Sequence, residues 1–173
     1  MTTLPLLLRF SLDKVPELAN RYAHGPDIPV IAIGRAARSR GYFTRAEFIE
    51  VCEWKTVRSK SRVTKNDEDA IVEATRLALS VRNEALRIGI PMLLHGVSWG
   101  TSSVLLHLAH RDPYPIIDYR ALDALGVPRG SVNYTVSFWI AYVKTCRELA
   151  RVAGVDMRTL DRAMWQWSAD GGG

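Results

Sequence analysis

Residues 94–118 read LHGVSWGTSSVLLHLAHRDPYPIID, and this stretch decides the fold that the sequence predicts. An apolar helical segment runs into a tight turn that contains Gly96 and Gly100, and a second helix follows from Thr101. A link with two prolines then leads to Asp118, which precedes another apolar run. Glycines permit backbone angles that other residues avoid, and they let a second backbone come close. The pattern therefore predicts two helices joined by a compact hairpin and followed by an aspartate.

This stretch resembles the helix-hairpin-helix DNA glycosylases of base-excision repair. Their hairpin reads roughly L-P-G-V-G-x-K-T-A, and a catalytic aspartate follows its second helix. Leu94, Gly96, Val97 and Thr101 match that pattern, and Asp118 falls at the family's spacing from Gly96 without a gap. The resemblance implies that the partner is double-stranded DNA.

In that family the hairpin holds DNA phosphates, since unpaired N–H groups at a helix N-terminus attract anions. By resemblance, phosphate contacts are expected at Gly96, Val97, Ser98, Gly100 and Thr101. Ser98 departs from the pattern because it replaces the second glycine of the turn. Gly100 stands where lyase-competent members carry a nucleophilic lysine, so no amine is offered for a Schiff base with the sugar. The resemblance therefore implies a monofunctional glycosylase, without lyase activity.

The resemblance assigns catalysis to Asp118. Breaking a base–sugar bond develops positive charge on the sugar, which a fixed carboxylate stabilises while it orients a water. The base must first leave the stack of the duplex. Asp118 also precedes the apolar residues Ala121 and Leu122, so it is suited to capping a helix. One carboxylate can serve both roles, and both interpretations stay open.

The most basic stretch, residues 55–65, has little apolar periodicity and is predicted to be a loop. Two interpretations are open: a solvated charged loop, or a loop that contacts DNA phosphates. A further cation, Arg120, follows Asp118 closely and has its own alternative, an ion pair with Asp123. The candidate DNA contacts are Lys55, Arg58, Lys60, Arg62 and Arg120.

Four aromatic side chains are candidates for stacking on an extruded base, although each is alternatively a core residue. They are Trp54, Trp99, Tyr114 and Tyr119. His107 and His110 lie three residues apart, a spacing that can place two metal ligands on one helix face. Since no third ligand is evident nearby in the sequence, no metal site is predicted.

Apolar periodicity and capping signals predict helices along the whole chain, and alternating β patterns are absent. The predicted helices cover about 29–40, 44–55, 66–80, 83–94, 101–109, 118–125, 131–153 and 156–167, with helical spacing also before residue 22. Thr44 and Glu47 form a capping box, Asn66 or Asp67 starts the helix that follows, and Asn83 caps the next one. Leu77 is expected on the apolar face of its helix, and the buried stripe of 131–153 is expected to be Val136, Ile140, Val143 and Leu149. Pro26 and Pro29 interrupt the chain. The fold class is therefore all-α. The resemblance implies a single compact helical unit, 1–173, whose two subdomains flank a cleft: about 1–43 with 127–173, and about 44–126 with the hairpin.

The chain has 173 residues and a net charge of +5, which suits an anionic partner such as DNA. Cys52 and Cys146 form no CxxC pair, so zinc and iron–sulfur spacings are absent and no cofactor is expected. Family hairpins can hold a monovalent cation through backbone carbonyls. Residues 4–8 are apolar but too few for a signal or a membrane span. A soluble, cytoplasmic protein without a membrane partner is therefore expected.

These observations lead to one expected function and two alternatives. The expected function is a DNA glycosylase that flips a damaged or mismatched base from duplex DNA and hydrolyses its N-glycosidic bond. The first alternative is a DNA-binding hairpin protein without catalysis, which would bind in a salt-dependent way and release no base. The second is a helical interaction module without a nucleic-acid role, in which Asp118 serves only as a cap.

Overall fold

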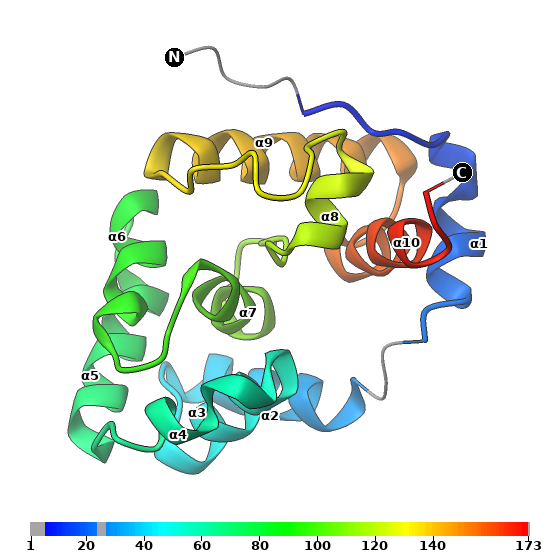
Figure 1. The fold of residues 1–173 in the computed structure, drawn as a ribbon. Coiled ribbons are helices and arrows are strands. Elements are labelled where there is room, and N and C mark those ends of the chain that lie inside the picture. The colour runs from blue at the N-terminus through cyan, green and yellow to red at the C-terminus, as the bar shows by residue number, and fades with distance from the viewer. Residues whose placement is uncertain (1–5, 24–26, 173) are drawn as a thin grey trace. The chain divides into compact units, whose positions relative to one another are not determined.

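The computed structural model describes residues 6–23 and 27–172, and in these residues it contains helices and no strand (Figure 1). This confirms the all-α prediction for the described part of the chain, from which Leu4 and Pro26 are excluded. The chain divides into two compact units. Unit 1 comprises Met1–Gly25 and Pro115–Gly173, and unit 2 comprises Pro26–Tyr114. The sequence analysis placed these boundaries at 43/44 and 126/127. Among the described helices, none combines the length and apolar character that crossing a membrane requires.

Unit 2 is built around its last helix. Its elements are α2 (Ile28–Arg40), α3 (Arg45–Lys55), η2 (Val57–Ser59), α4 (Lys60–Val63), α5 (Glu68–Ser80), α6 (Glu84–Gly89), η3 (Ile90–Leu93) and α7 (Trp99–Ala109). Helices α2, α3, α5 and α6 all pack against α7 (Figure 1). Val104, Leu105 and Leu108 are buried in α7, as their spacing predicts.

Helices α2 and α7 cross in close contact at Gly34. A Cβ added to Gly34 would lie 2.6 Å from the carbonyl oxygen of Leu108 and 2.7 Å from the Leu108 Cβ. The two helices therefore approach until backbone touches backbone, which only glycine allows at this position. Farther along α7, the Ser102 hydroxyl donates to the carbonyl of Ile88 at 2.7 Å, so the buried polar group is satisfied.

Helix starts in unit 2 follow the sequence signals closely. Thr44 and Glu47 form the predicted capping box of α3, and Asn83 caps α6 as expected. Of the two residues considered for the start of α5, Asp67 is the cap. The α2 helix ends at Gly41, whose φ of 90° is left-handed.

The loop prediction for residues 55–65 is wrong, because η2 and α4 lie within this stretch. Two residues anchor the segment: the Val63 side chain is fully buried, and the Ser59 hydroxyl donates to the carbonyls of Cys52 and Thr56. Leu77, expected inside, is half exposed, and Ala78 is buried instead. In both places, long-range packing and local capping determine the structure more strongly than the weak apolar periodicity of the sequence does.

Unit 1 is built around α10. Its elements are η1 (Leu12–Lys14), α1 (Val15–Asn20), α8 (Tyr119–Ala124), α9 (Val136–Ala153) and α10 (Met157–Ala169). Helices α1, α8 and α9 pack against α10 (Figure 1). The backbone N–H groups of Leu7 and Arg9 donate to the carbonyls of Leu125 and Ala124, which ties the N-terminal segment to the end of α8.

The α9 helix begins five residues later than the sequence predicts. Thr135 accepts a hydrogen bond from the N–H of Phe138 and so caps the helix. Its buried face also differs from the expected aliphatic stripe, because Val136 and Ile140 are exposed. Val143 of the predicted stripe is buried, and the aromatic side chains of Trp139 and Tyr142 are fully buried on the same helix.

The α2–α7 crossing predicts opposite outcomes for two helical glycines. Gly34→Ala forces a Cβ into the α7 backbone and should lower the free energy of unfolding by about 1–3 kcal/mol. Gly89→Ala meets no atom within 4 Å and should be neutral or stabilise the protein by about 0.4–1 kcal/mol. Urea titration of both variants measures the difference, and equal midpoints would contradict the crossing.

Candidate functional site

The hairpin turn of unit 2 depends on Gly96. Its φ is +79°, a left-handed angle that side-chain-bearing residues rarely adopt. A Cβ at this position would lie 2.8 Å from the Cβ of Arg62 and 3.0 Å from the backbone nitrogen of Val63. Gly96 is therefore required both by its backbone angle and by the close approach of α4. The basic segment lies directly on the hairpin.

A second contact fastens the basic segment to the turn. Asn66 is buried, and its side-chain amide bonds both backbone groups of His95: Oδ1 accepts from the His95 N–H at 2.8 Å, and Nδ2 donates to the His95 carbonyl at 3.0 Å. The same Nδ2 donates to the carbonyl of Val63 at 2.9 Å. One amide thus holds the end of α4 and the start of the hairpin together. The sequence analysis considered Asn66 only as a helix start, and nothing local to it signals a clamp.

The second hairpin helix begins at Trp99, two residues earlier than predicted. Ser98 occupies the N-cap position, but its side chain makes no capping hydrogen bond. Val97 donates its N–H to the carbonyl of Leu94 within the turn. Thr101, a predicted phosphate contact, is buried in the first turn of α7, with 1% of its surface exposed.

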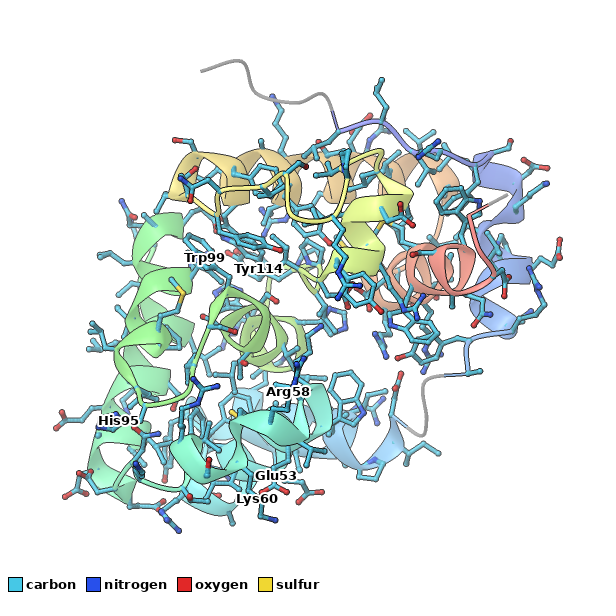
Figure 2. All side chains as sticks on the ribbon, viewed as in Figure 1. Glu53, Arg58, Lys60, His95, Trp99 and Tyr114 are labelled. Atoms are coloured by element: carbon cyan, nitrogen blue, oxygen red, sulfur yellow. The ribbon has the colours of Figure 1, made fainter. Side chains whose placement is uncertain are left out.

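Four of the predicted DNA-contacting cations belong to unit 2. Arg58 and Arg62 are exposed, and Arg62 lies beside the hairpin turn. Lys60 is exposed too, but its Nζ lies 3.1 Å from the Oε2 of Glu53, which offsets part of its charge (Figure 2). Lys55 is half-buried at the end of α3. Exposed Arg58 and Arg62, together with exposed Lys65, therefore supply positive charge at this segment.

Asp118 lies in unit 1 and caps α8. Its Oδ1 accepts hydrogen bonds of 2.9 Å from the N–H groups of Arg120 and Ala121. The capping interpretation is thus confirmed, while catalysis stays a prediction. The side chain is half-buried, and its backbone is extended, as is usual at an N-cap.

The chain leading to Asp118 is held on both sides. The buried hydroxyl of Tyr142 donates to the carbonyl of Ile116 at 2.8 Å, and the N–H of Ile116 donates to the carboxylate of Asp161 at 3.3 Å. Burial raises the pKa of Tyr142 well above its ordinary value, so the phenol stays a donor. Burial, together with the charge of Asp118, also raises the pKa of Tyr134.

The sequence analysis missed the positioning role of Asp161. A signal existed, because Asp161 stands in the apolar stripe that Met157, Leu160 and Met164 form on α10. A carboxylate in such a stripe needs a polar partner, which here is the backbone of Ile116 together with the guanidinium of Arg158.

The four aromatic candidates have different surroundings. Tyr114 is completely buried, and its hydroxyl donates to Glu84 at 2.6 Å and accepts from Arg87 at 2.7 Å, so it is a core residue of unit 2. Trp54 and Trp99 are half-buried. Tyr119 is 45% exposed and lies in unit 1 directly after Asp118.

The ion pair with Asp123 that was considered for Arg120 is not formed in the described chain, and its contact with a DNA phosphate stays a prediction. Its guanidinium lies over the rings of Tyr119 and Trp165, at 5.2 and 4.8 Å from their centroids. Asp123 instead accepts a hydrogen bond from the hydroxyl of Ser168 at 2.7 Å. Cation–π contact rather than an ion pair therefore orients Arg120.

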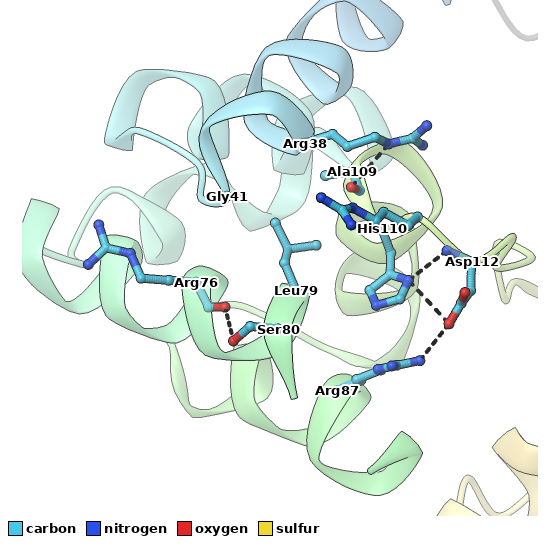
Figure 3. A pocket seen from close by; sticks show the side chains of 10 residues that line it. Arg38, Gly41, Arg76, Leu79, Ser80, Arg87, Ala109, His110 and Asp112 are labelled. Carbon is cyan, nitrogen blue, oxygen red and sulfur yellow. Dashed lines mark hydrogen bonds and ion pairs between the residues drawn. The ribbon is translucent and has the colours of Figure 1, made fainter. Parts of the chain in front are cut away.

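Unit 2 also contains a pocket of about 470 Å³ with several arginines around it (Figure 3). Arg38 donates to the carbonyls of Leu108 and Ala109 at the end of α7, and Arg87 donates to the carbonyl of Val81 at the end of α5. Helix C-termini carry partial negative charge and unpaired carbonyls, which guanidinium groups satisfy. Arg38 and Arg87 are therefore accounted for as helix caps, while Arg76 lies over the ring of Tyr42 and Arg111 is exposed.

His110 lies in the same pocket and is buried. Its Nδ1 accepts a hydrogen bond from the N–H of Asp112 at 2.9 Å, and its ring packs edge-on against Tyr114. Burial lowers the pKa of His110, and the charge of Arg87 lowers it further, while Asp112 acts in the opposite direction. The ring is therefore neutral at pH 7. The Nδ1 of the neighbouring His107 forms a hydrogen bond of 2.6 Å with the carbonyl oxygen of Tyr114.

The structure thus brings Gly96, Asn66 and Arg62 together in unit 2, while Asp118 and Tyr119 belong to unit 1. No family model, no curated protein and no solved structure matches this chain.

The Asn66 clamp predicts a stability loss on truncation. Asn66→Ala leaves the N–H and carbonyl of His95 without these partners and should cost about 1–3 kcal/mol of unfolding free energy. Asn133→Ala, at an exposed position of unit 1, is the matched control and should change it by less than about 0.5 kcal/mol. Denaturant titration measures both, and an unchanged Asn66 variant would contradict the clamp.

The buried neutral imidazole predicts a pH dependence. Because the folded pKa of His110 lies below its ordinary 6.5, its stabilising contribution is complete above pH 6.5 and is lost as the pH falls through the folded value. His110→Asn keeps an acceptor for the N–H of Asp112 but cannot titrate. Between about pH 7 and pH 5, the wild type should therefore lose more unfolding free energy than the variant. Parallel stability curves would contradict this assignment.

Proposed function

We propose that this protein is a DNA glycosylase-like enzyme of the helix-hairpin-helix type, and that unit 2 binds the phosphates of duplex DNA. One observation carries the proposal: the basic segment packs against the hairpin turn at Gly96, with Arg62 beside it. The two features selected separately as phosphate-binding candidates thus form one surface, which we call the hairpin face. It consists of η2, α4 and residues 95–100.

The start of α7 supports an anion at the hairpin face. The caps of α3, α5 and α6 accept hydrogen bonds through their own side chains, whereas Ser98 at the start of α7 does not. Unpaired N–H groups at a helix N-terminus attract a phosphate, and the helix dipole adds to that attraction. Exposed Arg58 and Arg62 supply the cations that make such binding strong and salt-dependent.

Asp118 is the proposed catalytic carboxylate. Its Oδ1 accepts hydrogen bonds from two N–H groups of α8. Two residues earlier, the backbone of Ile116 is held by Tyr142 and Asp161. A carboxylate held in this way stabilises developing positive charge without having to reorganise during the reaction. Backbone hydrogen bonds to a carboxylate also favour its charged form.

In the proposed reaction, the bond between the base nitrogen and C1′ of the sugar breaks, and its electron pair leaves with the base. Positive charge on the sugar develops next to Asp118. Water then bonds to C1′, and the proton that it loses passes to the carboxylate, while the departing base takes up a proton from solvent. Gly100 offers no amine, so no covalent enzyme–sugar adduct forms at that position.

A second candidate is a DNA-binding protein without catalysis. The observation that favours it is the use of the Asp118 Oδ1 as a cap, since a structural role alone explains both hydrogen bonds. This candidate shares the hairpin face with the first and differs only in base release.

The Asp118→Asn variant distinguishes the two candidate functions. Asparagine caps helices as well as aspartate does, so the variant keeps the fold and removes only the charge. Wild type should release free base from one member of a panel of duplexes that carry uracil, oxidised guanine, alkylated adenine or mismatched thymine. In the variant, base release should fall by about 100-fold or more, with duplex affinity unchanged.

Asp156→Asn is the matched control, because Asp156 also caps a helix, α10, by accepting a hydrogen bond from a backbone N–H, and it has no proposed chemistry. It should release base at the wild-type rate. Equal losses in both variants would mean that capping, not catalysis, explains the effect. Salt-sensitive duplex binding without release from any substrate would establish the second candidate.

A further inference from the structure

Unit 1 carries a series of contacting guanidinium groups and aromatic rings on α8, the turn after α8, α10 and the segment after α1. We call it the arginine–aromatic ladder and define it as Arg129, Tyr119, Arg120, Trp165, Tyr22 and Arg158. The sequence analysis singled out only Tyr119 and Arg120. The other four residues come together through the packing of α1 and α8 on α10.

Contacts join each step of the ladder to the next. Arg129 and Arg120 lie over the ring of Tyr119, at 4.6 and 5.2 Å from its centroid. Arg120 also lies 4.8 Å from the centroid of Trp165, whose ring packs edge-on against Tyr22 at 5.3 Å. Arg158 completes the series 5.0 Å from the centroid of Tyr22.

Cation–π contact with a ring leaves a guanidinium able to bind an anion through its N–H groups. A guanidinium carries its five N–H donors in its own plane, so a ring that covers the flat face does not use them. Contact with both Tyr119 and Trp165 also restricts the guanidinium of Arg120, which reduces the conformational entropy lost when it binds an anion. The ladder thus presents oriented donors with the geometry that phosphate accepts in pairs.

The net positive charge of the ladder is greatest at the end that contains Tyr119. Arg158 forms an ion pair with Asp161, which offsets its charge. Arg120 and Arg129 face aromatic rings rather than carboxylates, and Asp123 is held by Ser168. Arg129 is exposed and Tyr119 is 45% exposed, so this end of the ladder is open to a ligand.

We infer that the ladder binds single-stranded nucleic acid. Phosphates would bind the edges of Arg120 and Arg129, and an unpaired base would stack at the exposed Tyr119, displacing the guanidinium of Arg129 from its ring. Positive charge interleaved with aromatic faces is the combination that binds unpaired strands without a sequence requirement. An acidic peptide matches the charge but has no π face for Tyr119.

This site goes beyond the proposed duplex binding at the hairpin face and does not depend on base removal. It uses unit 1 alone. Tyr119 and Arg120 nonetheless follow Asp118 directly in the chain, and the N–H of Arg120 donates to the Asp118 carboxylate. A strand on the ladder would therefore pass close to that carboxylate.

The test is fluorescence anisotropy of a labelled oligothymidylate of about 12 nucleotides, titrated with the full chain at several salt concentrations. Tyr119→Leu should weaken binding at least about fivefold, the loss expected for one stacked base, and Tyr119→Phe should restore it. Arg129→Gln should lower the slope of log affinity against log salt by about 0.7, the value for one lost contact to a single-strand phosphate.

Two control variants carry the same kinds of substitution at positions outside the ladder. Tyr42→Leu removes a tyrosine that lies between Arg40 and Arg76 in unit 2, and Arg151→Gln removes an exposed charge of α9. Neither should alter binding. The inference is overturned if wild type does not bind, if ladder and control variants behave alike, or if Arg62→Gln alone abolishes binding. Equal competition by an oligoglutamate of the same charge would overturn it too, in favour of a protein partner. Each of these results is independent of base release from duplexes.

Discussion

Gly96 combines a left-handed φ of +79° with the absence of room for a Cβ, and the hairpin face depends on both properties. The turn brings η3 to an end and starts α7, the helix against which α2, α3, α5 and α6 pack. The same glycine lets α4 lie against the turn, and the buried amide of Asn66 then fastens α4 to His95. A single backbone constraint thereby links the central packing of unit 2 to the placement of its most basic segment.

In unit 1, a different set of contacts holds the proposed catalytic residue Asp118 in place. The central feature of unit 1 is an aspartate that must begin a helix, and the preceding backbone is fixed by a buried tyrosine hydroxyl and a buried carboxylate at Ile116. Capping and catalysis make compatible demands on Asp118, since both need a charged carboxylate held in one orientation. The aromatic and guanidinium groups next to it extend the same surface, with cation–π contacts in place of ion pairs.

Local chemistry made several elements predictable from the sequence. Capping side chains such as Thr44 and Asn83 act within one turn, so their positions predict helix starts directly. Features that depend on distant segments were not predictable. In the helical segment 57–63, Val63 is buried beside Gly96, and on α9 the side chains of Trp139 and Tyr142 are buried together with Val143. The Asn66 clamp joins residues 29 positions apart and leaves no local trace in the sequence.

The claim that the hairpin and the basic segment form one phosphate-binding surface is tested most directly by amide NMR. An undamaged DNA duplex would be titrated into the ¹⁵N-labelled protein, and the shift of each backbone N–H signal followed. The account predicts that the largest changes cluster at residues 58–66 and 95–101, and that they shrink together as salt is added. Signals in those two segments that stay unchanged while others move, or that move independently of each other, would contradict it.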